Sequence, residues 1–312
     1  MNPKAAKALI ISGVIVGGLA TGFGAGFLIG HFAKPKVPDF DNVDINAAED
    51  DNSGLIERYN AAKTAGKDPM SEFTIPELAN IALQKFESHE HSYSYGYGNV
   101  KSAVNLEIRN ATIKNGNEFM EESLSKSAAG AIVNVIVSQR DYQHGIEEGS
   151  DVDSYIGTIK DNNVENADWT NATKTTYTTE EYEDTFGKKV SRTSIYIVSS
   201  KSVLEDSTIE KTADGYTINM NLDTVKGVAR YRKRMMNISG SEVKSFEYVR
   251  LTYKVDSDFN LITTKTSERY AAGMGGVSAT CTGELTTYFY TGSTMELPGV
   301  TETITYPTEG GN

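Results

Sequence analysis

The sequence predicts an α+β protein: an N-terminal transmembrane helix followed by a mainly antiparallel, twisted β-sheet domain with a few helices. Three observations lead to this prediction. Residues 8–33 contain no Asp, Glu, Lys or Arg and are mostly apolar or glycine. From residue 91 onward, apolar and polar residues alternate in several long stretches, as in strands with one buried face. Turn residues recur between these stretches, and short connections favour antiparallel neighbours.

Residues 1–36 are predicted to form a cytoplasmic stub and a membrane anchor. At ~1.5 Å per residue, a helix over residues 8–33 would be about 39 Å long, more than the ~30 Å hydrocarbon core. A cleaved signal peptide has a shorter apolar region with its cleavage site after it, so we favour an uncleaved signal-anchor. Lysines flank the segment almost equally, and the short N-terminal tail favours a C-terminal domain outside the cytoplasm. The predicted location is the cell membrane, with a single span.

Four glycines recur at every fourth position of this segment. Gly18, Gly22, Gly26 and Gly30 would share one face of a helix. A face without side chains lets another helix backbone approach closely, so these residues are candidates for packing on a partner helix or on a second copy. Glycine is also common in membrane helices in general, and both interpretations stay open.

The charge of the chain argues against nucleic acid as a partner. The sequence has 30 Lys+Arg and 42 Asp+Glu, a net charge of −12. Four of the bases and none of the acids lie in residues 1–36, so the remainder carries 26 minus 42, or −16. Phosphate backbones repel such a surface. The single cysteine, Cys281, excludes an intrachain disulfide.

Residues 37–53 are predicted to be an acidic linker, because acids without bases keep a tether extended. The extracytoplasmic domain is predicted over residues 54–292, followed by a loose tail over 293–312. A helix is expected over residues 53–65. A second helix begins at Thr74, where Glu77 completes a capping box.

Strand patterns fill most of the rest of the domain. The first is the alternating tyrosine stretch at residues 93–97, and the turn at 114–117 predicts a hairpin. A short helix is expected over residues 179–186, and a second one over about 224–237. The remaining strands are expected at 104–109, 119–124, 131–137, 194–198, 216–222, 249–255, 261–270 and 277–289.

Two of these stretches combine a strictly alternating strand with an acidic turn. They are residues 213–223, ADGYTINMNLD, and residues 251–261, LTYKVDSDFNL. The order of elements over residues 75–290 resembles the extracytoplasmic β domains of Gram-positive membrane-anchored proteins and, in architecture, the LolA/LppX half-barrel group. The chain departs from that group in lacking a lipobox cysteine. The resemblance implies a half-barrel-like sheet whose concave side holds an apolar ligand.

The candidate ligand-binding residues are Tyr93, Tyr95 and Tyr97. They share one face of the predicted strand and alternate with Ser94 and Gly96, which leaves space between the rings. Such a face lines a pocket or stacks a sugar. Tyrosines that pack across neighbouring strands give the same pattern, so both interpretations stay open.

The sequence shows no complete catalytic or metal-binding set. His89 and His91 would share a strand face, but His144 is the only other histidine of the domain. Residues 123–126 match a Ser-x-x-Lys spacing without the Lys-Thr-Gly partner that such enzymes need. We therefore predict no metal, no cofactor and no enzymatic activity.

These observations predict a membrane-anchored, extracytoplasmic binding protein that holds an apolar or lipid-like ligand in a curved sheet. The alternative is a structural or regulatory subunit of a membrane or cell-surface complex, associating through the glycine face and the acidic domain. A pocket lined by tyrosine and apolar side chains favours the first function, and a filled interior favours the second.

Overall fold

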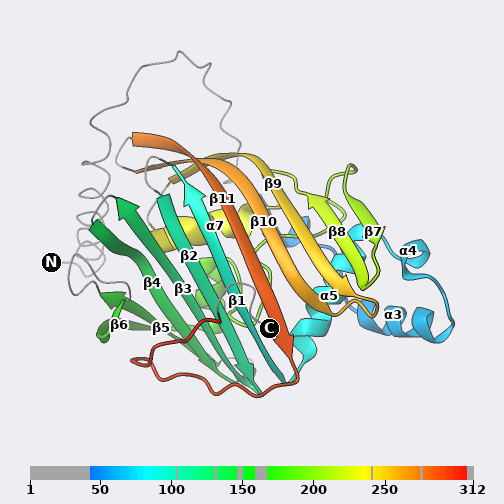
Figure 1. The fold of residues 1–312 in the computed structure, drawn as a ribbon, viewed down its shortest axis with the longest axis horizontal. Helices are drawn as coiled ribbons and strands as arrows, with labels where there is room; N and C mark the ends of the chain where they lie inside the picture. Colours follow the sequence, from blue (N-terminus) through cyan, green and yellow to red (C-terminus); the bar gives the residue numbers. More distant parts are fainter. Residues whose placement is uncertain are drawn as a thin grey trace, which may run out of the picture.

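The computed structural model describes residues 43–102, 105–129, 132–145, 150–158, 167–239, 242–274 and 277–307. In these residues one open antiparallel sheet dominates the fold, accompanied by a few helices (Figure 1). Its eleven strands lie in the order β6-β5-β4-β3-β2-β1-β11-β10-β9-β8-β7. The expectation of a large antiparallel sheet with few helices is therefore confirmed.

Most of the strands are long. Their bounds are β1 His91–Lys101, β2 Asn105–Asn115, β3 Glu118–Ala129, β4 Ile132–His144, β5 Asp151–Thr158, β6 Asp168–Thr178, β7 Thr208–Lys211, β8 Gly215–Asn221, β9 Glu242–Asp256, β10 Leu261–Met274 and β11 Val277–Thr291. The helices are α2 Ile45–Ala48, α3 Leu55–Thr64, α4 Pro69–Glu72, α5 Ile75–Ser88, α6 Thr179–Phe186 and α7 Ala229–Ser239.

Two meanders meet in the middle of the sheet. Strands β1 to β6 form the first and β7 to β11 the second, and the antiparallel pair of β1 with β11 joins them. The edges of the sheet are therefore β6 and β7. The chain passes from one edge to the other through α6 and the connection 187–207.

The two faces of the sheet differ in what covers them. Helices α5, α6 and α7 pack on one face, which we call the helix face. The opposite face, turned toward the viewer in Figure 1, is the front face. Because side chains alternate along a strand, Val249, Leu251 and Tyr253 of β9 are buried under the helices while Arg250 and Thr252 point to the front.

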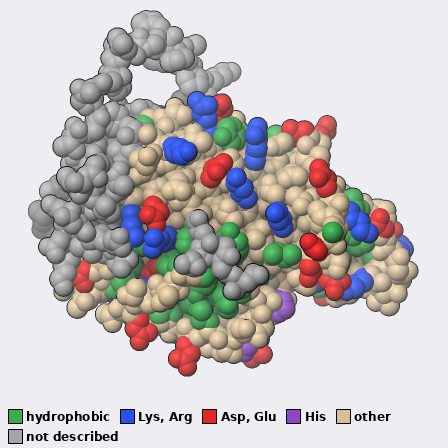
Figure 2. Space-filling model, in the orientation of Figure 1, with side chains coloured by type: hydrophobic (Ala, Val, Ile, Leu, Met, Phe, Trp, Pro, Cys, Tyr) green, Lys and Arg blue, Asp and Glu red, His purple; other side chains and the backbone are tan. Residues whose placement is uncertain are grey.

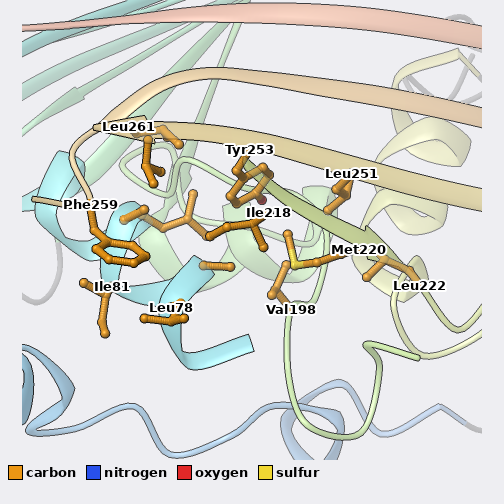
Figure 3. Packing of buried hydrophobic residues seen from close by; sticks show 14 of the residues in the cluster. Leu78, Ile81, Val198, Ile218, Met220, Leu222, Leu251, Tyr253, Phe259 and Leu261 are labelled. Carbon is orange, nitrogen blue, oxygen red and sulfur yellow. The ribbon is translucent and has the colours of Figure 1, made fainter. Parts of the chain in front are cut away.

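A large apolar cluster fills the layer between the helix face and the helices α3 and α5 (Figure 3). Leu78 and Ile81 of α5 meet Ile218 of β8 and Tyr253 of β9, and all four are at most 2% exposed. Each large apolar side chain buried in this way stabilises the fold by roughly 1.5–3 kcal/mol. This layer positions the helices against β8, β9 and β10.

Helices α5 and α6 begin at the capping boxes of the sequence. The backbone N and the Oγ1 of Thr74 donate to Glu77 Oε2 at 2.8 and 2.9 Å. At α6, Thr178 N donates to Glu181 Oε2 at 3.0 Å, and Glu181 N donates to Thr178 Oγ1 at 3.1 Å. Gly187 ends α6 with a φ of +80°, a conformation that glycine adopts without a steric penalty. The predicted bounds of α6 are confirmed.

The predicted fold class, with its transmembrane helix, is contradicted and needs correction. The structure is mostly antiparallel β-sheet. Among the helices of the described residues, none combines the length and the apolar character that crossing a membrane requires. The predicted anchor and its glycines Gly18, Gly22, Gly26 and Gly30 lie outside the described residues.

Two predicted elements of the second half differ from the structure. Residues 194–198 form no strand, although Ile197 and Val198 are buried. These residues lie in the connection 187–207, and Ile197 and Val198 are buried by packing between elements rather than by strand pairing. Helix α7 begins at Ala229 rather than near residue 224, because the amides of Val225 and Lys226 donate to Asp223 Oδ1 in a turn.

Part of the segment expected to be a linker contacts the domain. Residues 45–48 form α2, and Ala48 is buried. Ser199 Oγ donates to the Ala48 carbonyl at 2.7 Å, and Ser200 Oγ donates to Asp50 Oδ1 at 2.7 Å. These bonds fix the chain on the connection 187–207 just before α3 begins.

Strands β1 and β11 approach so closely at Gly98 that a side chain there would collide with the backbone of β11. A Cβ atom on Gly98 would lie 2.3 Å from the Glu284 carbonyl oxygen, whereas one on Gly96 would meet only side chains, at 3.0 Å or more for Thr287 and Leu285. We expect Gly98→Ala to lower the free energy of unfolding by about 1–3 kcal/mol because the backbone must shift. Gly96→Ala, the matched control, should lower it by less than about 1 kcal/mol. Chemical denaturation measures both, and equal losses would contradict the prediction.

Candidate functional site

The three tyrosines singled out in the sequence lie together on the front face. Tyr93 stacks on Tyr290 of β11, with ring centroids 4.7 Å apart and planes at 16°. Tyr95 meets Tyr93 edge to face at 5.5 Å and is only 2% exposed. Tyr97 continues the row along β1. We call Tyr93, Tyr95, Tyr97 and Tyr290 the tyrosine cluster.

Residues 293–307, which we call the C-terminal segment, cross the front face over strands β1 to β5 (Figure 1). The segment was expected to be loose, and it forms neither helix nor strand. It nevertheless packs on the sheet through Met295, Leu297, Val300 and Ile304, which contact an apolar cluster that includes Met120. Figure 2 shows hydrophobic side chains gathered on this part of the front face.

Side chains of the sheet donate hydrogen bonds to the C-terminal segment. Tyr142 of β4 donates through its hydroxyl to the Pro298 carbonyl at 2.9 Å, and the hydroxyl of Tyr97 donates to the Pro307 carbonyl. The Tyr95 hydroxyl lies 3.1 Å from the sulfur of Met295. Burial raises the pKa of both Tyr95 and Tyr142 to about 12, so both hydroxyls keep their protons at neutral pH.

A buried ion pair lies under the middle of the segment. Arg140 of β4 is 1% exposed, and its Nε lies 2.5 Å from Glu122 Oε2 of β3. Arg140 Nη1 donates to the Val300 carbonyl at 2.6 Å, and the Tyr306 hydroxyl donates to Glu122 Oε1 at 2.5 Å. The guanidinium also stands 4.3 Å from the ring centroid of Trp169. Arginine and glutamate therefore bind the segment while they neutralise each other.

A cavity of about 310 Å³ separates part of the C-terminal segment from β3, β4 and β5. Its lining is aromatic and apolar, with carboxylates and a histidine at one side: Glu118, Tyr142, His144, Asp153, Tyr155, Leu297, Pro298, Gly299 and Val300. The segment thus does not fill the surface on which it lies.

A second buried polar cluster occupies the helix face, where β3 and β4 meet α6 and α7. Glu121 lies 2.7 Å from Lys188 Nζ and 3.0 Å from Arg234 Nη2. The Tyr182 hydroxyl donates to Asp141 Oδ2 at 2.6 Å. Burial raises the pKa of Glu121, but Arg234 and Lys188 outweigh burial and the net shift is downward; burial raises the pKa of Asp141. These contacts fasten α6, α7 and the connection 187–207 to the sheet.

A fourth buried acid, Glu268 of β10, lies at the edge of the large apolar cluster. The Tyr196 hydroxyl donates to its Oε2 at 3.0 Å, and the Tyr231 hydroxyl of α7 donates to its Oε1 at 2.8 Å. Burial raises the pKa of Glu268 to about 7. This carboxyl group therefore titrates near neutral pH.

The three histidines of the described residues lie at the ends of helices and strands. His89 follows α5, His91 begins β1, and His144 ends β4, where its Nδ1 lies 3.5 Å from Glu118. In the part of the chain that the structure describes, no three His, Cys, Asp or Glu side chains are grouped so as to hold a metal ion.

Sequence reasoning found the tyrosines but missed Arg140, Glu122, Trp169 and Tyr306. One signal was present: Glu121-Glu122 and Arg140-Asp141 are adjacent charges within strand patterns. In a strand, adjacent residues point to opposite faces, so each pair sends one charge to each side of the sheet. Glu121 and Asp141 are buried because helices cover the helix face, and Glu122 and Arg140 are buried because the C-terminal segment covers the front face. Neither cover can be predicted from the strand patterns.

Comparison with protein-family models and with curated proteins found no match to this chain.

Proposed function

We propose that this protein is a non-enzymatic binding module that holds an apolar ligand on the front face of its sheet, over the tyrosine cluster. The main observation behind the proposal is that the C-terminal segment covers the tyrosine cluster on the front face. A row of tyrosines and an adjoining apolar cluster are covered by a segment that forms no helix or strand. Large aromatic and apolar surfaces with a few placed polar groups are typical of ligand sites.

The architecture supports an apolar ligand. An open antiparallel sheet with few helices fits the half-barrel group that the sequence resembles, whose members include lipid and lipoprotein carriers. In this chain the layer between the helices and the sheet holds a large apolar cluster of the protein's own side chains, so the front face is the better candidate surface. The resemblance also supports a location outside the cytoplasm.

The same filled layer favours a second function, that of a structural or regulatory subunit. A sheet whose helix face is packed by α3 and α5 has less room for a ligand on that side. In this case the acidic domain would dock on a partner protein, and the tyrosine cluster would contribute only stability.

The test compares ligand content in two variants by native mass spectrometry of the full chain, before and after organic extraction. We expect the wild-type protein to carry an apolar mass that extraction removes, and Tyr93→Ala to lower its occupancy at least about 10-fold, because the stacked surface with Tyr290 is lost. Tyr248→Ala, on β9 away from the cluster, is the matched control and should change nothing. Equal occupancy in both variants, or no apolar mass in any sample, would refute the proposal.

A further inference from the structure

The C-terminal segment lies on the front face as a bound peptide would. Three side chains of the sheet, Tyr97, Arg140 and Tyr142, donate hydrogen bonds to main-chain carbonyls of the segment. The acceptors belong to Pro307, Val300 and Pro298. Every polypeptide has main-chain carbonyls, so these three donors can bind another peptide as well as the C-terminal segment.

Two properties of the C-terminal segment indicate that it can leave the front face without unfolding the sheet. Residues 293–307 add no strand to either edge and lie across the face instead. None of these residues is fully buried, although residues beneath them such as Met120 and Ile113 are. Surface segments outside the helices and the sheet can open separately, at a fraction of the global unfolding free energy.

The segment also fits its place incompletely. The cavity of about 310 Å³ lies between Pro298, Val300 and the rings of Tyr142 and Tyr155. A chain with a larger side chain at the position of Val300 would fill the cavity and keep the carbonyl contacts.

The donors favour a polypeptide over an acyl chain. Arg140 is 1% exposed, and its guanidinium needs acceptors beyond Glu122, which the carbonyls of Gly299 and Val300 provide. An acyl chain has no acceptor for it. Two of the acceptor carbonyls belong to prolines, and Tyr306 lies between Tyr95 and Tyr97. Aromatic grooves bind extended proline-containing segments because these lose little conformational entropy on binding.

From these contacts we infer that the front face is a binding site for an extended, proline-containing polypeptide segment, and that the C-terminal segment is its built-in competitor. The inference rests on the binding surface of the proposed function and gives that surface a polypeptide, in place of an apolar small molecule, as its ligand. Because the competitor is tethered, its effective concentration is on the order of millimolar, and a partner peptide must outcompete it.

The experiment uses the full chain with a protease recognition sequence inserted after Ser293, an exposed position. The probe is a fluorescent synthetic peptide of residues 293–307, measured by anisotropy before and after cleavage. We expect the peptide to bind the cleaved protein at least about 100-fold more tightly than the uncleaved protein, because cleavage removes the tether. A peptide with the same composition in scrambled order should not bind.

Tyr97→Phe with Tyr142→Phe removes two donors while keeping both rings. Each lost hydrogen bond should weaken peptide binding about 5-fold. The control is Tyr248→Phe, at a front-face tyrosine of β9, which should leave peptide binding unchanged. If the peptide does not bind but a long-chain fatty acid does, the polypeptide class is overturned and the proposed function stands. If neither binds, both are overturned. If cleavage unfolds the sheet, as a thermal melt would show, the segment is part of the fold and the inference is overturned.

Discussion

Replacing Glu121 by glutamine is expected to lower the free energy of unfolding by about 3–5 kcal/mol. The carboxylate lies 2.7 Å from Lys188 Nζ and 3.0 Å from Arg234 Nη2, and all three side chains are buried. Glutamine keeps the shape but removes the negative charge, so two buried cations lose their counter-charge. Breaking a buried ion pair from one side is strongly destabilising for this reason. Denaturant unfolding monitored by circular dichroism measures the loss.

The matched control is Glu284→Gln on the front face. Glu284 pairs with Lys265 at 3.6 Å, and both side chains are more than half exposed. Pairs of this kind contribute about 0–1 kcal/mol, because water screens them. A loss at position 121 no larger than that at position 284 would contradict the prediction and show that water reaches the cluster.

Local signals in the sequence predicted the elements that local chemistry determines. Alternation predicted most strands, the capping box at Thr74 placed the start of α5, and a short helix was predicted at the bounds of α6. The basic helix α7 shows where this reasoning fails. Arg230 and Arg234 are four residues apart, so they share a face of the helix, and charged faces of helices are usually solvated. In the structure that face is buried, because Glu49 and Glu121 reach it from distant parts of the chain.

The candidate site divides in the same way. The period of a strand placed Tyr93, Tyr95 and Tyr97 on one face without knowledge of any partner. The C-terminal segment has no periodic pattern, and its contact with Arg140 joins residues 160 apart in sequence. No local rule predicts such a contact. The helix prediction for residues 8–33 rests on composition alone, and these residues lie outside the described part of the chain.

The stability of the protein is expected to fall as pH rises toward 7 because of Glu268, and Glu268→Gln should remove this part of the pH dependence. Burial raises the pKa of Glu268 from 4.5 to about 7. Below about pH 4.5 both the folded and the unfolded state hold the proton, and the stabilising contribution is fully present. Between 4.5 and 7 the folded state binds more proton than the unfolded state, so the free energy of unfolding falls as pH rises. Above 7 both states are ionised and the loss is complete, at about 3 kcal/mol.

Other acids change stability in the opposite direction, so the difference between the wild-type protein and the variant is the quantity to measure. Lys174 and Thr176 outweigh burial and hold the pKa of Asp153 below its usual value, and such groups lose their contribution as pH falls. Denaturant unfolding of both proteins at pH 5 and pH 8 isolates Glu268. From pH 5 to pH 8, we expect the free energy of unfolding of the variant to rise by about 3 kcal/mol relative to that of the wild-type protein. An unchanged difference would mean that Glu268 titrates as an exposed acid.

The geometry around Glu268 explains why the effect should reach beyond one side chain. The two oxygens of the carboxyl group are within hydrogen-bond distance of the hydroxyls of Tyr196 of the connection 187–207 and Tyr231 of α7, at 3.0 and 2.8 Å, and a hydroxyl can accept from the neutral acid as well as donate to it. An ionised carboxylate needs more donors or water than these two hydroxyls provide. Admitting water requires α7 or the connection to move away from β10. We therefore expect amide hydrogen exchange in α7 to accelerate between pH 5 and 8 beyond the intrinsic change in exchange rate, and not in Glu268→Gln. Equal exchange in the two proteins would show that the carboxylate is solvated without any movement of the helix.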